Sequence, residues 1–293
     1  MKYIMNIVLV KSLFLLSPFF WGCDRDNSET LPYIPNDTIV TSDEQPMLYG
    51  KWEKIEELSD EFDGSQLDAD KWLNHHPYWT GRIPSQFNKE NVSVSDGSLK
   101  IKTTLAEAAH EGSSTKHWIW TGCVTSKSEM CYYGYYEARL KACNLSMSNA
   151  FWLQSQKNII EIDVTEAIGN SKLIPNDSKT MNINTHDTRN GGWENDIETR
   201  IQVELPDGKK SSDDFFIYGV LWEPTRIVFY LNNKKVGEIN PKRFDKKMFL
   251  FFDVETFAWQ GFPSVSDFQN EMLDKTMYVD YVRSYKRTDI TYD

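Results

Sequence analysis

The sequence predicts an all-β fold in the form of a β-sandwich, and two observations carry this prediction. From Trp52 onward, short runs of Val, Ile, Phe and Tyr are separated by Gly, Asn, Asp and Pro. The first group favours strands and the second group favours turns. Helical periodicity is rare over the same region, and many short strands joined by turns are typical of a sandwich. A chain of 293 residues has room for one large domain or two average ones, and we expect one.

The N-terminus predicts a bacterial lipoprotein signal peptide over residues 1–22. A lysine-containing start leads into an apolar run that is too short for a transmembrane helix, and Cys23 follows it. Cys23 is the expected lipidation site; the alternative is an ordinary secretory signal with an incidental cysteine. Residues 23–46 are polar and acidic without periodicity, which predicts a flexible tether. The folded domain, 47–293, would be held at the outer membrane or cell surface by its lipid alone, or otherwise be secreted.

The composition argues against a nucleic-acid partner and for a ligand with flat, partly apolar faces. The net charge of −11 gives no general attraction to polyanions. Aromatic residues make up 14% of the chain, including 10 Trp and 14 Tyr, which is more than a core of this size requires. We therefore expect some rings on a binding surface, and sugars present faces that suit them.

Three cysteines remain after Cys23, namely Cys123, Cys131 and Cys143. An odd number leaves two alternatives open, one disulfide with a free thiol or three buried, reduced cysteines. Their spacing does not match that of a metal site.

Alternation and turn residues locate the strands in order. Residues 91–95 and 98–102 predict a hairpin around Asp96-Gly97, a turn dipeptide that accepts positive φ. In the run 116–124, two tryptophans two residues apart would share one face of a strand. Further strands are expected at 132–140, 149–154, 159–167, 181–186, 214–222, 226–232, 249–254 and 277–285.

Residues 74–82 contain Pro, Gly and polar groups that predict a loop. This loop would present His76, Trp79 and Arg82. A tryptophan beside a guanidinium offers a platform for a sugar ring and a planar fork of donors for an anionic substituent such as sulfate. The alternative is that Trp79 packs under the loop and Arg82 pairs with an acid.

The strand at 159–167 carries three acids within an apolar, β-branched run. Side chains alternate between the two faces of a strand, so Glu161 and Asp163 point the same way. Glu166 has the opposite parity. A β-bulge near Val164-Thr165 would add one residue and return Glu166 to the face of the other two acids. The alternative is an ordinary amphipathic strand with a solvated acidic face.

Three neighbouring carboxylates raise at least one pKa and cost folding free energy, so they are hard to explain as a stability device. They suit glycoside hydrolysis, in which one ionised carboxylate attacks the anomeric carbon and a protonated carboxyl assists the leaving oxygen. Asp163 would share or relay a proton with Glu161. Four strand steps span roughly 13 Å, whereas a retaining pair needs carboxyls about 5–5.5 Å apart, so the strand must curve and the side chains must lean together.

These residues resemble the glycoside hydrolases of family 16. The segment 161–166 is similar to the bulged E-x-D-x-x-E signature of that family. The resemblance implies a jelly-roll β-sandwich with a concave substrate cleft and a retaining mechanism. It assigns Glu161 as nucleophile, Asp163 as its partner and Glu166 as general acid/base. It covers nearly everything after about residue 48, through similar blocks at 59–64, 91–101, 134–141, 150–153, 218–230 and 277–285.

Within the family, residues 76–82, His186 and 252–259 resemble the agarases and porphyranases, which act on red-algal galactans. The residues before the acids, 154–160, lack the W-P-x-x-G-E-I-D pattern of laminarinase relatives. The spacing of His76, Trp79 and Arg82 resembles that of porphyranases and favours porphyran, the sulfated polymer. Two features keep neutral agarose open: Gln154 stands where a second arginine is expected, and enzymes that act on neutral agarose can also contain a W-x-G-R loop. The implied substrate-binding residues are His76, Trp79, Arg82, Trp152, His186, Trp193, Glu255 and Trp259.

The resemblance implies an endo-acting enzyme on β-1,4 galactosidic linkages that requires no cofactor. Members of the family often hold a structural calcium on the convex side, which makes Asp280 a candidate ligand. A non-catalytic surface glycan-binding protein is the alternative from another class, and a purely structural surface protein is a third. A pure binder has no reason to keep all three acids, and a structural protein would leave the aromatic surplus unexplained.

Overall fold

The computed structural model describes residues 49–189, 192, 199–241 and 243–292, and the observations below concern these residues. The predicted signal peptide, tether and Cys23 lie outside them and stay predictions, and Trp193 also lies outside them. Within the described residues, none of the helices has the length and apolar character to cross a membrane.

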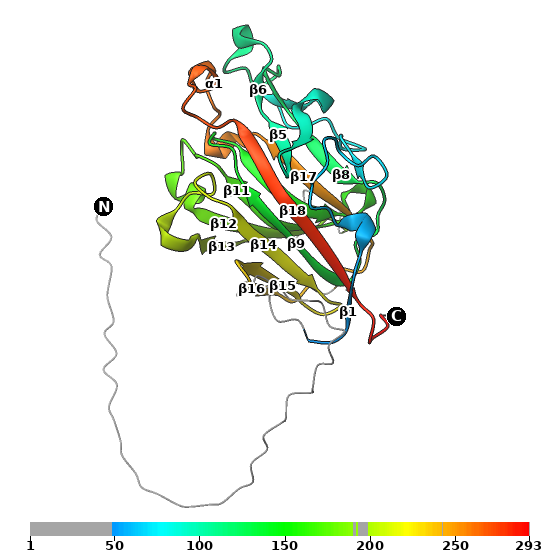
Figure 1. Cartoon of the computed structure of the whole chain (residues 1–293). Helices are drawn as coiled ribbons and strands as arrows, with labels where there is room; N and C mark the ends of the chain where they lie inside the picture. Colours follow the sequence, from blue (N-terminus) through cyan, green and yellow to red (C-terminus); the bar gives the residue numbers. More distant parts are fainter. Residues whose placement is uncertain (1–48, 190–191, 193–198, 242, 293) are drawn as a thin grey trace, which may run out of the picture. The chain divides into compact units, whose positions relative to one another are not determined.

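The all-β prediction is confirmed: nearly all regular structure consists of strands in two large sheets and one small one (Figure 1). The first sheet, in the order β16-β15-β14-β9-β18-β5-β4 with β1 also paired to β18, contains β1 (Trp52–Lys54), β4 (Val92–Ser95), β5 (Ser98–Lys102), β9 (Gly134–Lys141), β14 (Phe216–Trp222), β15 (Ile227–Leu231), β16 (Lys234–Ile239) and β18 (Thr276–Arg287). The second, in the order β13-β12-β11-β10-β17-β8-β2, contains β2 (Trp72–Leu73), β8 (Cys123–Ser126), β10 (Ser148–Gln154), β11 (Ile160–Ile168), β12 (Thr180–Asp187), β13 (Ile201–Glu204) and β17 (Phe249–Glu255).

The small sheet and the helices connect these strands. The small sheet has the order β3-β7-β6, with β3 (Ser85–Phe87), β6 (Thr104–Leu105) and β7 (Ile119–Thr121). One short α-helix, α1 (Val265–Gln269), precedes β18. The described 3-10 turns are η1 (Glu56–Leu58), η2 (Lys89–Asn91), η3 (Ala108–His110), η4 (Gln156–Asn158), η5 (Pro175–Lys179), η7 (Pro206–Gly208) and η8 (Ala258–Gln260).

The chain passes repeatedly from one large sheet to the other. It goes from β8 in the second sheet to β9 in the first, back to β10, and later from β16 to β17 and then to β18. The two sheets face each other across the core (Figure 1). Such alternation between two antiparallel sheets is the connectivity of a jelly roll.

The apolar face of β11 fixes the orientation of its acids. Ile160, Ile162 and Val164 are fully buried in the main core, together with Phe151 and Leu153 of β10. Burying several such side chains stabilises the fold by about 1.5–3 kcal/mol each, which strongly disfavours any slip in register. The intervening residues of β11 must therefore face away from the core.

The predicted β-bulge is present in β11. Along β10, Phe151 pairs with Thr165 and the next residue, Trp152, pairs with Asp163, so Val164 has no partner in the ladder. This extra residue resets the alternation, which places Glu166 on the side of Glu161 and Asp163.

The run 116–124 differs from the prediction of one strand. It forms parts of two strands, β7 and β8, which belong to different sheets. The break falls at Gly122, where a Cβ would lie 2.7 Å from Val92 Cγ2. Trp118 lies outside both strands and is fully buried, while Trp120 is only half-buried, so the two rings do not share one environment.

The three described cysteines are buried and free, which supports the alternative of reduced thiols. Burial raises the pKa of Cys123, Cys131 and Cys143. Nucleophilic thiol chemistry is therefore disfavoured at these positions.

Asp280 lies on β18 of the first sheet, opposite the sheet that carries the acids. Its carboxylate accepts a hydrogen bond of 2.7 Å from Arg139 Nη1. This contact involves Oδ2 alone and does not test a cation site, so the calcium at Asp280 stays a prediction.

Among the described glycines, Gly169, which follows β11, is the position where an added methyl group has the least room. A Cβ at Gly169 would overlap the carbonyl oxygen of Cys143 and lie 3.0 Å from that of Leu145. We expect Gly169→Ala to lower the free energy of unfolding by about 3 kcal/mol or more, because backbone on both sides would have to shift. Urea unfolding measures this. Gly64→Ala is the control, since its Cβ would meet nothing closer than 3.4 Å; equal effects of the two substitutions would contradict the prediction.

Candidate active site

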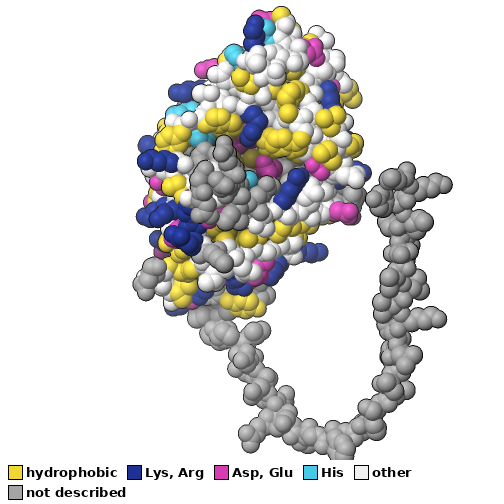
Figure 2. All heavy atoms as spheres, turned by 180° about the vertical axis from the view of Figure 1, so that it is seen from behind, with side chains coloured by type: hydrophobic (Ala, Val, Ile, Leu, Met, Phe, Trp, Pro, Cys, Tyr) yellow, Lys and Arg dark blue, Asp and Glu magenta, His cyan; other side chains and the backbone are white. Residues whose placement is uncertain are grey.

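A cavity of about 1080 Å³ opens on the face of the second sheet that points away from the core. Figure 2 views the domain from this side and shows acidic, basic and histidine side chains among hydrophobic ones near the middle of the face. Strands β10, β11, β12 and β17 supply the floor. The residues singled out from the sequence that line this cavity are His76, Trp79, Arg82, Trp152, Glu161, Asp163, Glu166, His186, Glu255 and Trp259.

Two of the three acids of β11 meet side chains from the neighbouring strands. Gln154 of β10 stands opposite Glu161, and its Nε2 donates a hydrogen bond to Glu161 Oε2. His186 of β12 stands opposite Glu161 on the other side. His186 Nε2 lies 3.4 Å from Asp163 Oδ2 and 4.0 Å from Glu161 Oε1. One imidazole therefore faces two of the three carboxyls.

Burial and mutual repulsion shift the proton affinities of the two glutamates. Burial, and then the charge of Asp163, raise the pKa of Glu166 well above its usual value. The same two causes raise the pKa of Glu161, but the hydrogen bond from Gln154 and the nearby His186 oppose the rise. His186 also opposes the rise for Glu166, and the net shift of both glutamates is toward the protonated form. A carboxyl that keeps its proton to a higher pH can serve as the general acid of glycoside hydrolysis.

Glu161, Asp163 and His186 are also the one group of described acidic, histidine and cysteine side chains that could hold a metal ion. Their ligand atoms lie within 4.8 Å of one another. Carboxylate oxygen and imidazole nitrogen are ligands that suit zinc and other divalent transition metals. The same groups are placed for proton transfer, which needs no metal.

His76 is packed into the wall of the cavity, whereas we expected the loop to present it. Its ring is stacked on those of Phe251 and Trp152, with ring centroids 4.7 Å and 6.0 Å away. It meets the Trp79 ring edge-on, with the centroids 5.8 Å apart. Burial, with a smaller contribution from His75, lowers the pKa of His76 to about 4. A neutral imidazole that orders Trp79 and Trp152 is the role that this packing supports.

Arg82 and Glu255, both expected to bind substrate, bind each other. Arg82 Nε donates a hydrogen bond of 2.7 Å to Glu255 Oε2. The Arg82 guanidinium also lies 5.8 Å from the ring centroid of Trp79 and 5.2 Å from that of Phe257. The ion pair expected in the alternative for Arg82 is present, whereas Trp79 is only half-buried and lines the cavity. The half-exposed Arg82 side chain still lines the cavity, where the charge of Glu255 offsets that of the guanidinium.

Comparison with known proteins assigns the family. Residues 52–287 match the family described as "Beta-porphyranase A-D, GH16 domain", where GH16 denotes glycoside hydrolase family 16. The chain belongs to this family. It is 34% identical to beta-porphyranase B of Zobellia galactanivorans, with 82% of this chain and 86% of that protein covered. It is 27% identical to a beta-agarase of Phocaeicola plebeius, over 78% of this chain and 81% of that protein.

Solved structures agree with the fold. The crystal structure of a beta-porphyranase from the human gut bacterium Bacteroides plebeius superposes with a TM-score of 0.72 at 31% identity, covering 85% of this chain and 97% of that one. The protein is therefore a family 16 glycoside hydrolase with the jelly-roll fold.

Two tryptophans of this glycoside hydrolase contribute to the cavity in different ways. Trp259 is 51% exposed and stacks on Phe257 with ring centroids 4.3 Å apart, which offers a flat platform to a sugar. Trp152 is buried, and its Nε1 donates a hydrogen bond of 2.8 Å to Asp253 Oδ1. It shapes the floor more than it offers an exposed face.

Sequence reasoning missed several residues that line the cavity of the glycoside hydrolase. Asn182 and Asn184 alternate with His186 along β12, so this strand's period of two was a usable signal. Asp253 precedes Glu255 by two residues on β17, so the same alternation predicts that both side chains lie on one face of the strand. Arg200 had no such signal, because its place beside the cavity depends on the pairing of β13 with β12.

Proposed function

We propose that this glycoside hydrolase is an endo-acting, retaining enzyme that cleaves β-1,4 galactosidic linkages in red-algal galactans, and that its substrate is porphyran. The observation that carries the proposal is the placement of Glu161, Asp163 and Glu166 on one face of β11 within a large cavity. The match to the beta-porphyranase family supports the choice of substrate.

In the first step, a carboxylate oxygen of Glu161 forms a bond to the anomeric carbon while the bond from that carbon to the leaving sugar oxygen breaks. Glu166 transfers its proton to that oxygen. In the second step, Glu166 removes a proton from water, the water oxygen attacks the anomeric carbon, and the bond to Glu161 breaks. Both carboxyls return to their starting states. His186 Nε2, 3.4 Å from Asp163 Oδ2 and 4.0 Å from Glu161 Oε1, places an imidazole beside the nucleophile.

The second candidate function is that of a beta-agarase acting on neutral agarose. Two observations favour it: Gln154, a neutral residue, lies beside Glu161, and Arg82 is already paired with Glu255. The similarity to a curated beta-agarase agrees with this reading.

Reducing-end release by the purified full-length protein on porphyran, agarose and laminarin separates these candidates. We expect porphyran to be cut at least about tenfold faster than agarose, because a charged hydrogen bond to a sulfate ester is worth about 1.5–3 kcal/mol. Laminarin should not be cut. A preference for agarose would assign the beta-agarase instead, and binding without cleavage of any polymer would indicate a glycan-binding protein.

A further inference from the structure

Two arginines line the cavity among the described residues, and they stand on opposite sides of the catalytic strand. Arg82 belongs to the loop beside Glu255 of β17. Arg200 directly precedes β13, whose Ile201 pairs with Ile183 of β12. In the second sheet, β11 lies between β12 and β13 on one side and β10 and β17 on the other. A sugar chain that crosses these strands would meet one arginine on each side of the acids.

The two guanidinium groups differ in how fully they are engaged. Arg82 Nε is 2.7 Å from Glu255, a short charge-assisted hydrogen bond. Arg200 Nη2 is 3.7 Å from Asp177 Oδ2, which is beyond hydrogen-bond distance. The Arg200 side chain is 47% exposed. Among the described residues, its contact with Asp177 therefore leaves N–H donors available on the side of the cavity.

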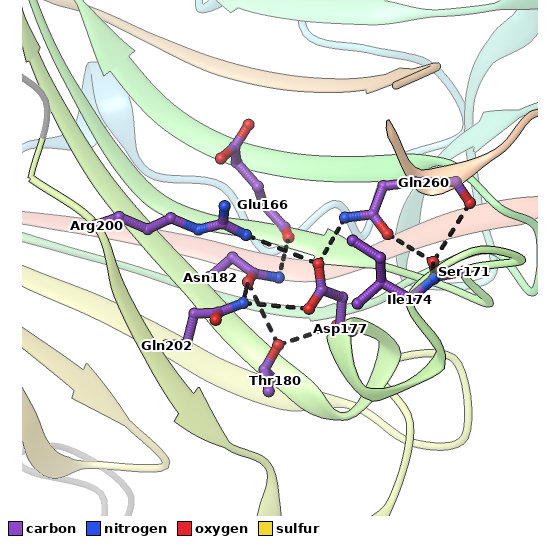
Figure 3. Close-up of polar contacts among 9 residues, drawn as sticks. All are labelled: Glu166, Ser171, Ile174, Asp177, Thr180, Asn182, Arg200, Gln202 and Gln260. Carbon is purple, nitrogen blue, oxygen red and sulfur yellow. Dashed lines mark hydrogen bonds and ion pairs between the residues drawn. The ribbon is translucent and has the colours of Figure 1, made fainter. Parts of the chain in front are cut away.

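Asp177 does not depend on Arg200 for its hydrogen bonds. Gln260 Nε2 donates to Asp177 Oδ2 at 2.6 Å, and Gln202 Nε2 donates to Asp177 Oδ1 at 3.2 Å (Figure 3). Both carboxylate oxygens of this buried residue thus have an amide partner. An arginine is not needed here to satisfy a buried acid, which is the usual structural reason for one.

The backbone at Arg200 is held in place on both sides. Thr199 and Thr185 exchange two backbone hydrogen bonds of 3.2 Å, and Gln202 Nε2 donates to Asn182 Oδ1 at 2.7 Å. Asn182 in turn donates from Nδ2 to the backbone oxygen of Glu166 at 3.1 Å (Figure 3). The base of Arg200 is therefore tied to the strand segment that carries the general acid.

We infer that Arg200 binds the sulfate ester of a galactan residue seated on the β13 side of the cleaved bond. This inference rests on the proposed function and specifies which side chain selects the sulfated polymer. A guanidinium presents a planar fork of N–H donors that matches sulfate oxygens. Arg200 lines the cavity, so a ligand bound there lies within its reach. Arg82, neutralised by Glu255, contributes less to selectivity.

The competing role for Arg200 is electrostatic. Its positive charge opposes the rise that burial and Asp163 cause in the pKa of Glu166. Such a role would change the rate and its pH dependence equally on every substrate. Sulfate binding would cause an additional loss on the sulfated polymer alone.

The test compares the full-length wild type with Arg200→Gln and Arg200→Lys on porphyran and on chemically desulfated porphyran. We expect Arg200→Gln to lower kcat/KM on porphyran about 10- to 100-fold and on the desulfated polymer less than about threefold, as for the loss of one charged hydrogen-bonded pair. Arg200→Lys should be intermediate, since it keeps the charge and loses the fork. The matched control is Arg226→Gln, which removes an equally exposed arginine paired with Glu223 outside the cavity and should change neither rate. Equal losses on both polymers would overturn the inference.

A binding measurement separates this inference from the proposed function. Glu161→Gln and the double variant Glu161→Gln/Arg200→Gln are titrated with sulfated porphyran oligosaccharides and with desulfated ones. We expect the second substitution to weaken binding of the sulfated ligand at least about tenfold and that of the desulfated ligand little. If the wild type cut no galactan, the proposed function would fail while this measurement still decided the role of Arg200. Unchanged affinity for the sulfated ligand would refute that role.

Discussion

Replacing Glu161 with Gln should lower kcat on porphyran by about 10⁴-fold or more, equivalent to at least about 5.5 kcal/mol of barrier. An amide cannot form the glycosyl-enzyme bond, so the two-step path is closed. The amide still accepts a hydrogen bond from Gln154 and keeps the shape of the carboxyl, so the cavity should stay intact. Reducing-end release gives the rate, and titration with oligosaccharide gives the affinity, which we expect to change less than about tenfold.

Glu238→Gln is the matched control for this substitution. Glu238 lies on β16 of the first sheet and pairs with Lys235 at 2.5 Å, away from the cavity. Its replacement should leave both rate and affinity unchanged. Residual activity of Glu161→Gln within about tenfold of the wild type would show that another group attacks the anomeric carbon.

Replacing Glu166 with Gln should lower kcat/KM on porphyran by about 10²- to 10⁴-fold, the usual contribution of a general acid. It should also change the pH profile. The pKa of Glu166 is raised by burial and by Asp163, so its protonated form persists to a higher pH than for an exposed glutamate. The first step requires that proton. Wild-type kcat/KM should therefore fall as the pH rises through the raised pKa, and Glu166→Gln should lack this fall.

A substrate whose leaving group needs no proton provides the internal control for Glu166. In an aryl galactoside with an acidic phenol, the phenolate leaves without being protonated. The rate of the first step should therefore recover in Glu166→Gln on this substrate, which absorbance would show as a burst of released phenol. The Glu161→Gln variant should give no burst. Absence of a burst from Glu166→Gln, or an unchanged basic limb in its pH profile, would contradict the assignment.

The candidate acids were predictable from the sequence because their placement depends on short-range geometry. Alternation along a strand and one bulge at Val164 account for the common face of Glu161, Asp163 and Glu166. The hairpin at Asp96-Gly97 was predictable for the same reason, since two residues with positive φ specify the turn. Both features are set by neighbours in the chain.

The wall of the cavity was only partly predictable. Arg82 and Glu255 were both predicted from the sequence to bind substrate. Their ion pair joins positions 173 residues apart, so the sequence pattern left open whether Arg82 would face a ligand or an acid. The run at Trp118 and Trp120 looked like one strand, yet Gly122 allows the chain to change sheets within it. The alternation of side chains along a strand does not indicate where the chain passes from one sheet to another.

By itself, then, the sequence determined the all-β class, the acidic strand with its bulge, and the resemblance that led to the family. The tertiary structure alone decided that Arg82 is neutralised, that His76 is buried against Phe251, and that Arg200 lies beside the cavity. The physical reason is range. Strand period and turn chemistry act over a few residues, whereas the order of strands in a sheet and the pairing of buried charges depend on which distant segments the packed core brings together.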